Sequence, residues 1–293
     1  CDCNLIKEIT IPSSVALIDG CAFRELNYLQ KVSFESPSSV TIIREYAFYK
    51  CRSLNEIEIP NSVAFIEKNT FCHCEKLTNV LINYRSSSLK CIDEKAFKKC
   101  YNLTSFIFPR SLTSIKHKAF IHCSSLKKLS STSVKEIGSK SFYDCKSLTE
   151  ISMGSAKYIC SDAFAKCPLI KTAYIPSVIE IHKNAFYECA KLVEVSINSV
   201  GKIKSSAFTG CVLLRKVEIG NSLSSVGCIA FAGWSSLVEF NFLDSLEFIG
   251  FYAFYGCFGI THVNIPDSIE NIEEGAFYGC SSITDLKIPQ RIK

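Results

Sequence analysis

Cysteine is the residue type here whose chemistry most needs explaining, because a thiolate can attack an electrophile, bind a metal or form a disulfide. The 293 residues include 17 cysteines, and most of them close a recurring segment of the form AF-x-x-C. Ten share this position: Cys51, Cys74, Cys100, Cys123, Cys145, Cys167, Cys189, Cys211, Cys257 and Cys280. Leu26 and Trp234 occupy it in two further copies. A position that accepts leucine and tryptophan requires an apolar body, so we interpret this cysteine column as buried packing.

A ladder of disulfides between neighbouring copies is the competing interpretation. Bridged cysteines need Cα atoms within about 7 Å, whereas helical turns packed side by side lie about 8–10 Å apart. The total of 17 is also odd, so complete pairing is excluded. We therefore expect free thiols in the column, and cysteine usage does not identify the cellular compartment.

Two other arrangements offer reactive groups. The segment CHC at 72–74 contains metal-ligand types, but tetrahedral zinc needs four converging ligands and Cys74 belongs to the buried column. Cys160 and His182 hold the same position in adjacent copies, so a Cys–His dyad is a remote alternative without a third residue. No G-x-S-x-G, H-E-x-x-H or P-loop sequence occurs. We expect no enzyme, no metal site and no cofactor.

These cysteines belong to a repeat that runs along the whole chain. Each copy of the repeat contains a phenylalanine. An aliphatic β-branched residue stands five positions before it, and leucine or isoleucine stands six positions after it. The phenylalanine recurs at intervals of 22–26 residues in twelve copies: Phe23, Phe48, Phe71, Phe97, Phe120, Phe142, Phe164, Phe186, Phe208, Phe231, Phe254 and Phe277. Such a period is typical of a solenoid, in which stacked units bury a core that no single unit can bury.

Each unit predicts two elements. The pattern L-x-x-I-x-I, as in LNEIEI at 54–59, alternates and is rich in β-branched residues, so it predicts a short strand. Phenylalanine and cysteine three positions apart share one face of a helical turn. Stacking then places the strands in a parallel sheet and the helical turns on the opposite side.

The unit IPNSVAFIEKNTFCHCEKLTNVLI and its eleven relatives resemble the BspA-type leucine-rich repeats, which belong to surface proteins of bacteria and of mucosal protozoan parasites. The resemblance implies a leucine-rich-repeat solenoid with a parallel β-sheet on the concave face and short helical turns on the convex face. It also implies a cell-surface or secreted location and a role in adhesion. Partial copies at 1–12 and 283–293 lead us to expect a single solenoid over 1–293 taken from a longer chain.

In leucine-rich repeats the variable strand positions project from the concave sheet and form a binding platform. Leu81 and Ile107 are apolar where polar residues are usual, and Tyr174 stands between Ser152 and Ser196 in neighbouring copies. Ordinary exposed apolar surface is the alternative interpretation. Our candidate partner-binding residues are Glu56, Glu58, Leu81, Ile107, Tyr174, Lys216, Glu218 and His262.

Charge is distributed unevenly along the chain. Residues 85–128 contain ten basic residues against Asp93 and Glu94, whereas residues 231–286 contain eight acids and no lysine or arginine. The basic zone could bind sulfated glycans, although solvated faces that keep a long array soluble would look similar. Its candidate residues are Lys95, Lys98, Lys99, Lys116, Lys118, Lys127 and Lys128.

The expected partner is therefore a host or matrix protein or a glycan. Nucleic acid is not expected, because no aromatic residues are interleaved with the basic ones. No apolar run reaches the about 18 residues of a membrane-spanning helix, so membrane insertion of this segment is not expected. The alternative function is that of an intracellular scaffold that recruits partner proteins, for which reduced thiols would suit the cytoplasm.

Overall fold

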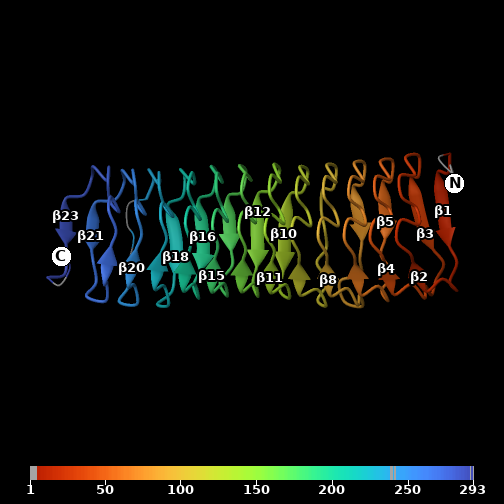
Figure 1. The fold of residues 1–293 in the computed structure, drawn as a ribbon, viewed down its shortest axis with the longest axis horizontal. Helices are drawn as coiled ribbons and strands as arrows, with labels where there is room; N and C mark the ends of the chain where they lie inside the picture. Colours follow the sequence, from red (N-terminus) through yellow and green to blue (C-terminus); the bar gives the residue numbers. More distant parts are fainter. Residues whose placement is uncertain (1–4, 238–239, 241, 291, 293) are drawn as a thin grey trace. The chain divides into compact units, whose positions relative to one another are not determined.

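The computed structural model describes residues 5–237, 240, 242–290 and 292. The chain divides into two compact units, Cys1–Leu148 and Thr149–Lys293, and each is a parallel β-solenoid (Figure 1). A typical turn contributes one strand of three or four residues and one strand of two residues. We call the sheets that these two kinds of strand build the long-strand sheet and the short-strand sheet.

The first unit contains both sheets. Its long strands are β1 (Glu8–Ile11), β3 (Lys31–Phe34), β5 (Glu56–Glu58) and β7 (Asn79–Leu81), which pair in that order, and β10 (Lys128–Ser131). Its short strands pair in chain order as β2 (Leu17–Ile18), β4 (Ile42–Ile43), β6 (Phe65–Ile66), β8 (Cys91–Ile92), β9 (Ser114–Ile115) and β11 (Glu136–Ile137).

The second unit repeats this arrangement. Its long strands are β12 (Glu150–Met153), β14 (Thr172–Tyr174), β16 (Glu194–Ile197) and β18 (Lys216–Ile219), with β21 (His262–Asn264) and β23 (Asp285–Lys287) as a separate pair. Its short strands pair as β13 (Tyr158–Ile159), β15 (Glu180–Ile181), β17 (Lys202–Ile203), β19 (Ser225–Val226), β20 (Phe248–Ile249) and β22 (Asn271–Ile272).

The predicted long strands form because their residues alternate between the core and the solvent. In β5, Ile57 is buried between exposed Glu56 and Glu58, and it lies beside Val80 of β7 in the parallel register. A strand of period two that buries one face stabilises its own register, since a slip by one residue would expose the apolar side chains. The prediction of short parallel strands from L-x-x-I-x-I is confirmed.

The phenylalanine column forms the centre of the core. Phe48 and Phe71 stack with ring centroids 5.3 Å apart and an interplanar angle of 3°, and Phe186 and Phe208 stack at 5.1 Å and 1°. The rings from Phe48 to Phe254 are fully buried. The predicted core column is therefore confirmed.

The predicted helical turns are wrong: the AF-x-x-C segments contain no helix in the described part of the chain. The residues two positions before and two positions after each column phenylalanine have positive φ, as Tyr46 (φ 59°) and Lys50 (φ 58°) do around Phe48. Their N–H groups and that of Phe48 donate to carbonyls of the following turn rather than four residues back. This alternation of left-handed and right-handed residues is incompatible with a helix, whose N–H groups bond within the segment.

The short-strand sheet was not predicted. Each of its strands has only two residues and ends at the aliphatic column residue, as Ile43 and Ile66 do in β4 and β6. A two-residue strand has no stability by itself. It forms because the residues at the equivalent positions of the neighbouring turns provide its hydrogen-bond partners.

Ile107 was expected on a long strand, but residues 103–109 form none. The alternation is kept, since Phe106 and Phe108 are buried and Ile107 is exposed. The rings of Phe106 and Phe108 lie 5.1 Å apart, at two core positions that hold smaller aliphatic side chains in most other copies. We attribute the interrupted ladder to the combined volume of these two neighbouring rings.

Within the residues that the structure describes, no helix has the length and apolar character of a membrane span. The expectation of a single solenoid over 1–293 stays a prediction.

Candidate functional site

The first unit has a hollow on its long-strand sheet. It encloses about 450 Å³, and Glu56, Glu58 and Leu81 line it together with Lys31 and Ser33. The parallel register sets Glu58 directly beside Leu81, whose side chain is 44% exposed. The structure thus brings three candidate partner-binding residues into one shallow depression with an apolar and an acidic part.

Ile107 does not join that hollow. It lines a smaller one of about 320 Å³ with Tyr84, Lys128 and Ser130. The guanidinium of Arg110 lies 5.3 Å from the Tyr84 ring centroid. The predicted apolar pair of Leu81 and Ile107 is therefore divided between two depressions of the same unit.

In the second unit, Tyr174 and Glu218 lie in one row across three long strands. The register places Tyr174 beside Ser196, and Ser196 beside Glu218. The Ser196 hydroxyl donates to Glu218 at 2.7 Å, and Lys216 Nζ lies 2.9 Å from the same carboxylate. These contacts, led by the serine hydrogen bond, lower the pKa of Glu218. Tyr174, which is 53% exposed, thus lies in the same row as this charged group, with Ser196 between them.

His262, the last candidate of this group, is on β21, outside the β12–β18 sheet. Its Nδ1 lies 2.8 Å from the hydroxyl of Thr261. The structure therefore gives it no place in the row that contains Tyr174.

The predicted basic zone divides into two groups. Lys95, Lys98, Lys99 and Lys118 lie on the turns around Phe97 and Phe120, and we call these four the basic turn surface. Lys128 instead begins β10 in the long-strand position, with Lys127 immediately before it. Charges that are close in the sequence thus lie on different sides of the solenoid turn.

Only part of the basic turn surface is neutralised. Lys95 Nζ lies 2.5 Å from Glu94, and Lys68 contacts the same carboxylate at 3.0 Å. The hydrogen bond from Lys95, followed by that from Lys68, lowers the pKa of Glu94 to about 2. Lys98, Lys99 and Lys118 form no ion pair with any residue that the structure describes.

Lys116, the remaining candidate of the basic zone, forms an ion pair. Its Nζ lies 3.0 Å from Glu136, and the hydrogen bond between them raises the pKa of Lys116. His117 and His73 lie near the same turns, and burial together with neighbouring lysines lowers the pKa of each imidazole. Near neutral pH the uncompensated positive charge therefore comes from lysines.

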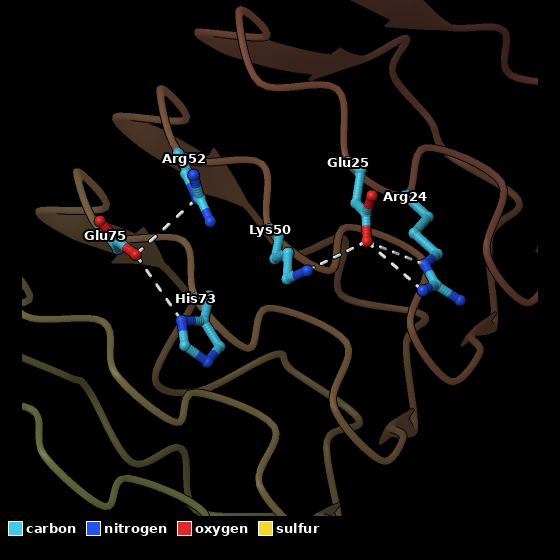
Figure 2. Close-up of polar contacts among 6 residues, drawn as sticks. All are labelled: Arg24, Glu25, Lys50, Arg52, His73 and Glu75. Atoms are coloured by element: carbon cyan, nitrogen blue, oxygen red, sulfur yellow. Dashed lines mark hydrogen bonds and ion pairs between the residues drawn. The ribbon is translucent and has the colours of Figure 1, made fainter.

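The turns of the first unit also hold a charged cluster that the sequence analysis missed (Figure 2). Arg24 and Lys50 lie on either side of the Glu25 carboxylate, each with a nitrogen 3.3 Å from it. Glu75 lies between His73 (3.6 Å) and Arg52 (3.9 Å). The available signal was the repeat itself. Glu25, Lys50 and His73 share the column two positions after the phenylalanine, and Arg52 and Glu75 share the column four positions after it.

The cysteine column consists of free thiols, as do all cysteines in the part of the chain that the structure describes. The spacing argument against disulfides was wrong, since stacked phenylalanines of adjacent turns are only about 5 Å apart, as in the 5.2 Å pair Phe71–Phe97. Most of these thiols instead donate to the phenylalanine carbonyl of the preceding turn, as Cys74 does to Phe48 at 3.2 Å. Trp234 makes the same bond through Nε1 to Phe208. The column therefore combines an apolar body with a donor.

The segment CHC holds no metal cluster, and no group of three potential ligands occurs among the residues that the structure describes. Cys72, although outside the cysteine column, is also buried at 2% exposure, and burial raises its pKa to about 11. His182, the proposed partner of Cys160, has Nε2 3.8 Å from Glu180.

Thiol labelling of the native protein provides the first test. Burial raises the pKa of Cys51 to about 12 and that of Cys74 well above its ordinary value, so neither forms the reactive thiolate at neutral pH. We expect a chromogenic disulfide reagent to modify exposed Cys21 within minutes, and the column only after denaturation. Peptide mapping by mass spectrometry identifies the labelled sites. Fast labelling of the column in the folded protein would contradict its packing role.

The repeats of this chain are similar to those of known proteins. A family model described as a BspA type leucine rich repeat region of six copies matches residues 1–127, 81–193 and 201–293. A leucine-rich repeat protein from Bacteroides ovatus has 27% sequence identity and a TM-score of 0.66, over 98% of this chain and 82% of that one. A leucine rich cell surface protein from Faecalibacterium prausnitzii has 23% identity and a TM-score of 0.47, over 96% and 87%. No curated protein sequence matches significantly.

Proposed function

Because this chain belongs to the BspA-type leucine-rich repeat family, we propose that it is a non-enzymatic binding protein, located at the cell surface or secreted, that mediates adhesion to host or matrix macromolecules. The repeat scaffold supports this proposal. Its columns fill a core, and the remaining positions form rigid outward faces on which a large ligand can make many contacts. Fractionation of the producing cells, with antibody labelling of intact cells, tests the location, and confinement to the cytoplasm would contradict it.

The observation that carries the binding proposal is the basic turn surface. Three ammonium groups that pair with no acid among the described residues, those of Lys98, Lys99 and Lys118, lie on adjacent turns. The backbone below them is fixed, since the N–H groups of Lys99 and Lys118 donate to Ile121 and Ser139 of the following turn. Because the backbone is already ordered, binding has to order only the lysine side chains. We propose that it binds sulfated glycans of the host or matrix.

Heparin is the probe for this proposal. The triple variant Lys98→Glu/Lys99→Glu/Lys118→Glu should lower the affinity at least about tenfold, because attraction is replaced by repulsion at three points. Wild-type binding should also weaken with salt, since the screening length falls from roughly 30 Å at 0.01 M to about 3 Å at 1 M. Surface plasmon resonance on immobilised heparin measures both effects.

The matched control reverses three lysines of the same unit outside these turns. Lys7, Lys76 and Lys90 are exposed, and their replacement by glutamate changes the net charge by the same amount. We expect this control to retain most of the affinity. Equal losses in the two triple variants would show a nonspecific charge effect and contradict the assignment of the site.

A further inference from the structure

The turns of the second unit carry a cluster of exposed tyrosines. The rings of Tyr255 and Tyr278 are parallel, with centroids 5.8 Å apart and an interplanar angle of 2°. Tyr252 meets both edge-on, at 5.9 Å and 6.3 Å. The three side chains are 37% (Tyr252), 47% (Tyr255) and 65% (Tyr278) exposed, and Phe251 and Phe258 beside them in sequence are also exposed. We call Tyr252, Tyr255 and Tyr278 the tyrosine cluster.

The first unit contains two of these tyrosines at equivalent repeat positions, but there cations cover one of them. Tyr46 meets Tyr49 edge-on at 5.4 Å, in the columns of Tyr252 and Tyr255. The Arg24 guanidinium and the Lys50 ammonium lie 5.4 Å and 5.2 Å from the Tyr49 ring centroid. Glu25 holds both cations, as Figure 2 shows. The chain thus uses its own arginine and lysine to cover this aromatic surface.

The tyrosine cluster lacks these cations. The columns of Arg24 and Lys50 are occupied by Ala232 and Gly256, and residues 231–286 contain no lysine or arginine. No cation lies over Tyr255 or Tyr278 among the residues that the structure describes. In the first unit, cations of the chain itself lie over the Tyr49 ring. The equivalent ring of Tyr255 is therefore open to a cation from another molecule.

Two acidic residues, Glu273 and Glu274, lie on the turn that contacts Tyr252. The Tyr252 N–H donates to the Glu274 carbonyl at 3.2 Å, and Glu273 precedes it on the same turn. The Tyr252 ring lies directly over Gly275, where a Cβ would come within 2.4 Å of it. Neither Glu273 nor Glu274 forms an ion pair with any described residue. The turn whose backbone binds Tyr252 thus carries two acidic side chains that no described residue neutralises.

We propose that the tyrosine cluster, with Glu273 and Glu274, is a docking surface for arginine or lysine side chains of a basic segment of a partner protein. These side chains would take the positions over the rings that Arg24 and Lys50 take over Tyr49. Arginine is favoured, because its planar guanidinium stacks on an aromatic ring and also donates to a carboxylate. This surface is separate from the basic turn surface and attracts the opposite charge.

The test uses the full chain and a fluorescein-labelled peptide with four arginines spaced by Gly-Ser, followed by fluorescence anisotropy. The variant Tyr255→Ala/Tyr278→Ala should weaken binding about five- to tenfold, the loss expected for two cation–ring contacts. Tyr255→Phe/Tyr278→Phe keeps the rings and should bind like the wild type. Tyr28→Ala/Tyr158→Ala removes two exposed tyrosines outside the cluster and should change nothing.

A second variant supplies the missing cation from the chain itself. Gly256 has φ +64°, close to the 58° of Lys50 at the equivalent position, and an added Cβ would lie 3.7 Å from the Phe258 ring. Gly256→Lys should therefore fold and place an ammonium over Tyr255. We expect it to weaken peptide binding severalfold while leaving heparin binding unchanged.

Three results would overturn the proposal. The wild type could bind the arginine peptide no better than a peptide with glutamine in place of arginine. The Tyr255→Ala/Tyr278→Ala variant could bind like the wild type, with circular dichroism showing that it is folded. Sedimentation could show a dimer that this variant abolishes, which would assign the surface to a second copy of the chain. Heparin binding is measured in parallel, so failure of this proposal is distinguished from failure of the glycan proposal.

Discussion

Replacing Phe120 by alanine is expected to lower the free energy of unfolding by about 3–5 kcal/mol. The ring is fully buried, and its centroid lies 5.1 Å from that of Phe97 and 5.2 Å from that of Phe142. Phe106 also meets it edge-on at 5.0 Å. Truncation removes the transfer free energy of the ring and leaves a cavity that the stacked turns on both sides prevent from closing.

Urea unfolding followed by circular dichroism measures this loss. Phe65→Ala is the control, because Phe65 is 45% exposed on β6 of the same unit. We expect the control to cost less than about 1 kcal/mol, as surface substitutions usually do. In a solenoid each turn contacts only its neighbours, so the Phe120→Ala defect should also appear as faster amide hydrogen exchange in the adjacent turns. A loss equal to that of the control would contradict the packed phenylalanine column.

Replacing Glu188 by proline is expected to cost at least about 3 kcal/mol, although the side chain is exposed and its carboxylate makes no ion pair with a described residue. Glu188 has φ 58°, which the proline ring cannot adopt. Its N–H donates to the Thr209 carbonyl of the following turn at 2.9 Å, and proline has no N–H. Both the local conformation and one rung of the turn ladder would be lost. Urea unfolding again measures the effect.

Glu188→Gly distinguishes the observed turn from a helix. In a left-handed position a non-glycine residue costs roughly 1–2 kcal/mol, and glycine relieves this cost at the expense of greater freedom in the unfolded chain. We therefore expect Glu188→Gly to be neutral or to stabilise by about 1 kcal/mol. Glycine inside a helix would destabilise by about that amount. The equivalent position already holds Gly210 and Gly233, both with positive φ.

The core could be predicted from the sequence because burial depends on residue type and period. The column that contains Phe120 and the column that contains Ile115 never change character, and both are fully buried in the middle of the chain. The LNEIEI pattern likewise predicted β5, since alternation determines which side chains can face a core. Family membership followed from the same columns.

The turns could not be predicted, because a spacing of three between Phe120 and Cys123 fits both a helix and the observed turn. The choice depends on where the backbone N–H groups find acceptors. In the folded protein Phe120 donates to Ser141 of the next turn, and Lys118 and His122 adopt positive φ to donate in the same direction. Those acceptors exist only once the neighbouring turn is in place.

For the candidate surfaces, too, some features could be predicted from the sequence and others required the tertiary structure. The sequence by itself determined that the chain is a solenoid, which columns are buried and that positive charge gathers between 85 and 128. Only the tertiary structure decided that Lys98 and Lys118 share a turn surface, that Lys116 is paired with Glu136, and that Lys128 belongs to a long strand. The physical reason is that burial is a property of residue type and period, whereas a charge or an exposed ring acquires its role from the side chains that adjacent turns place beside it.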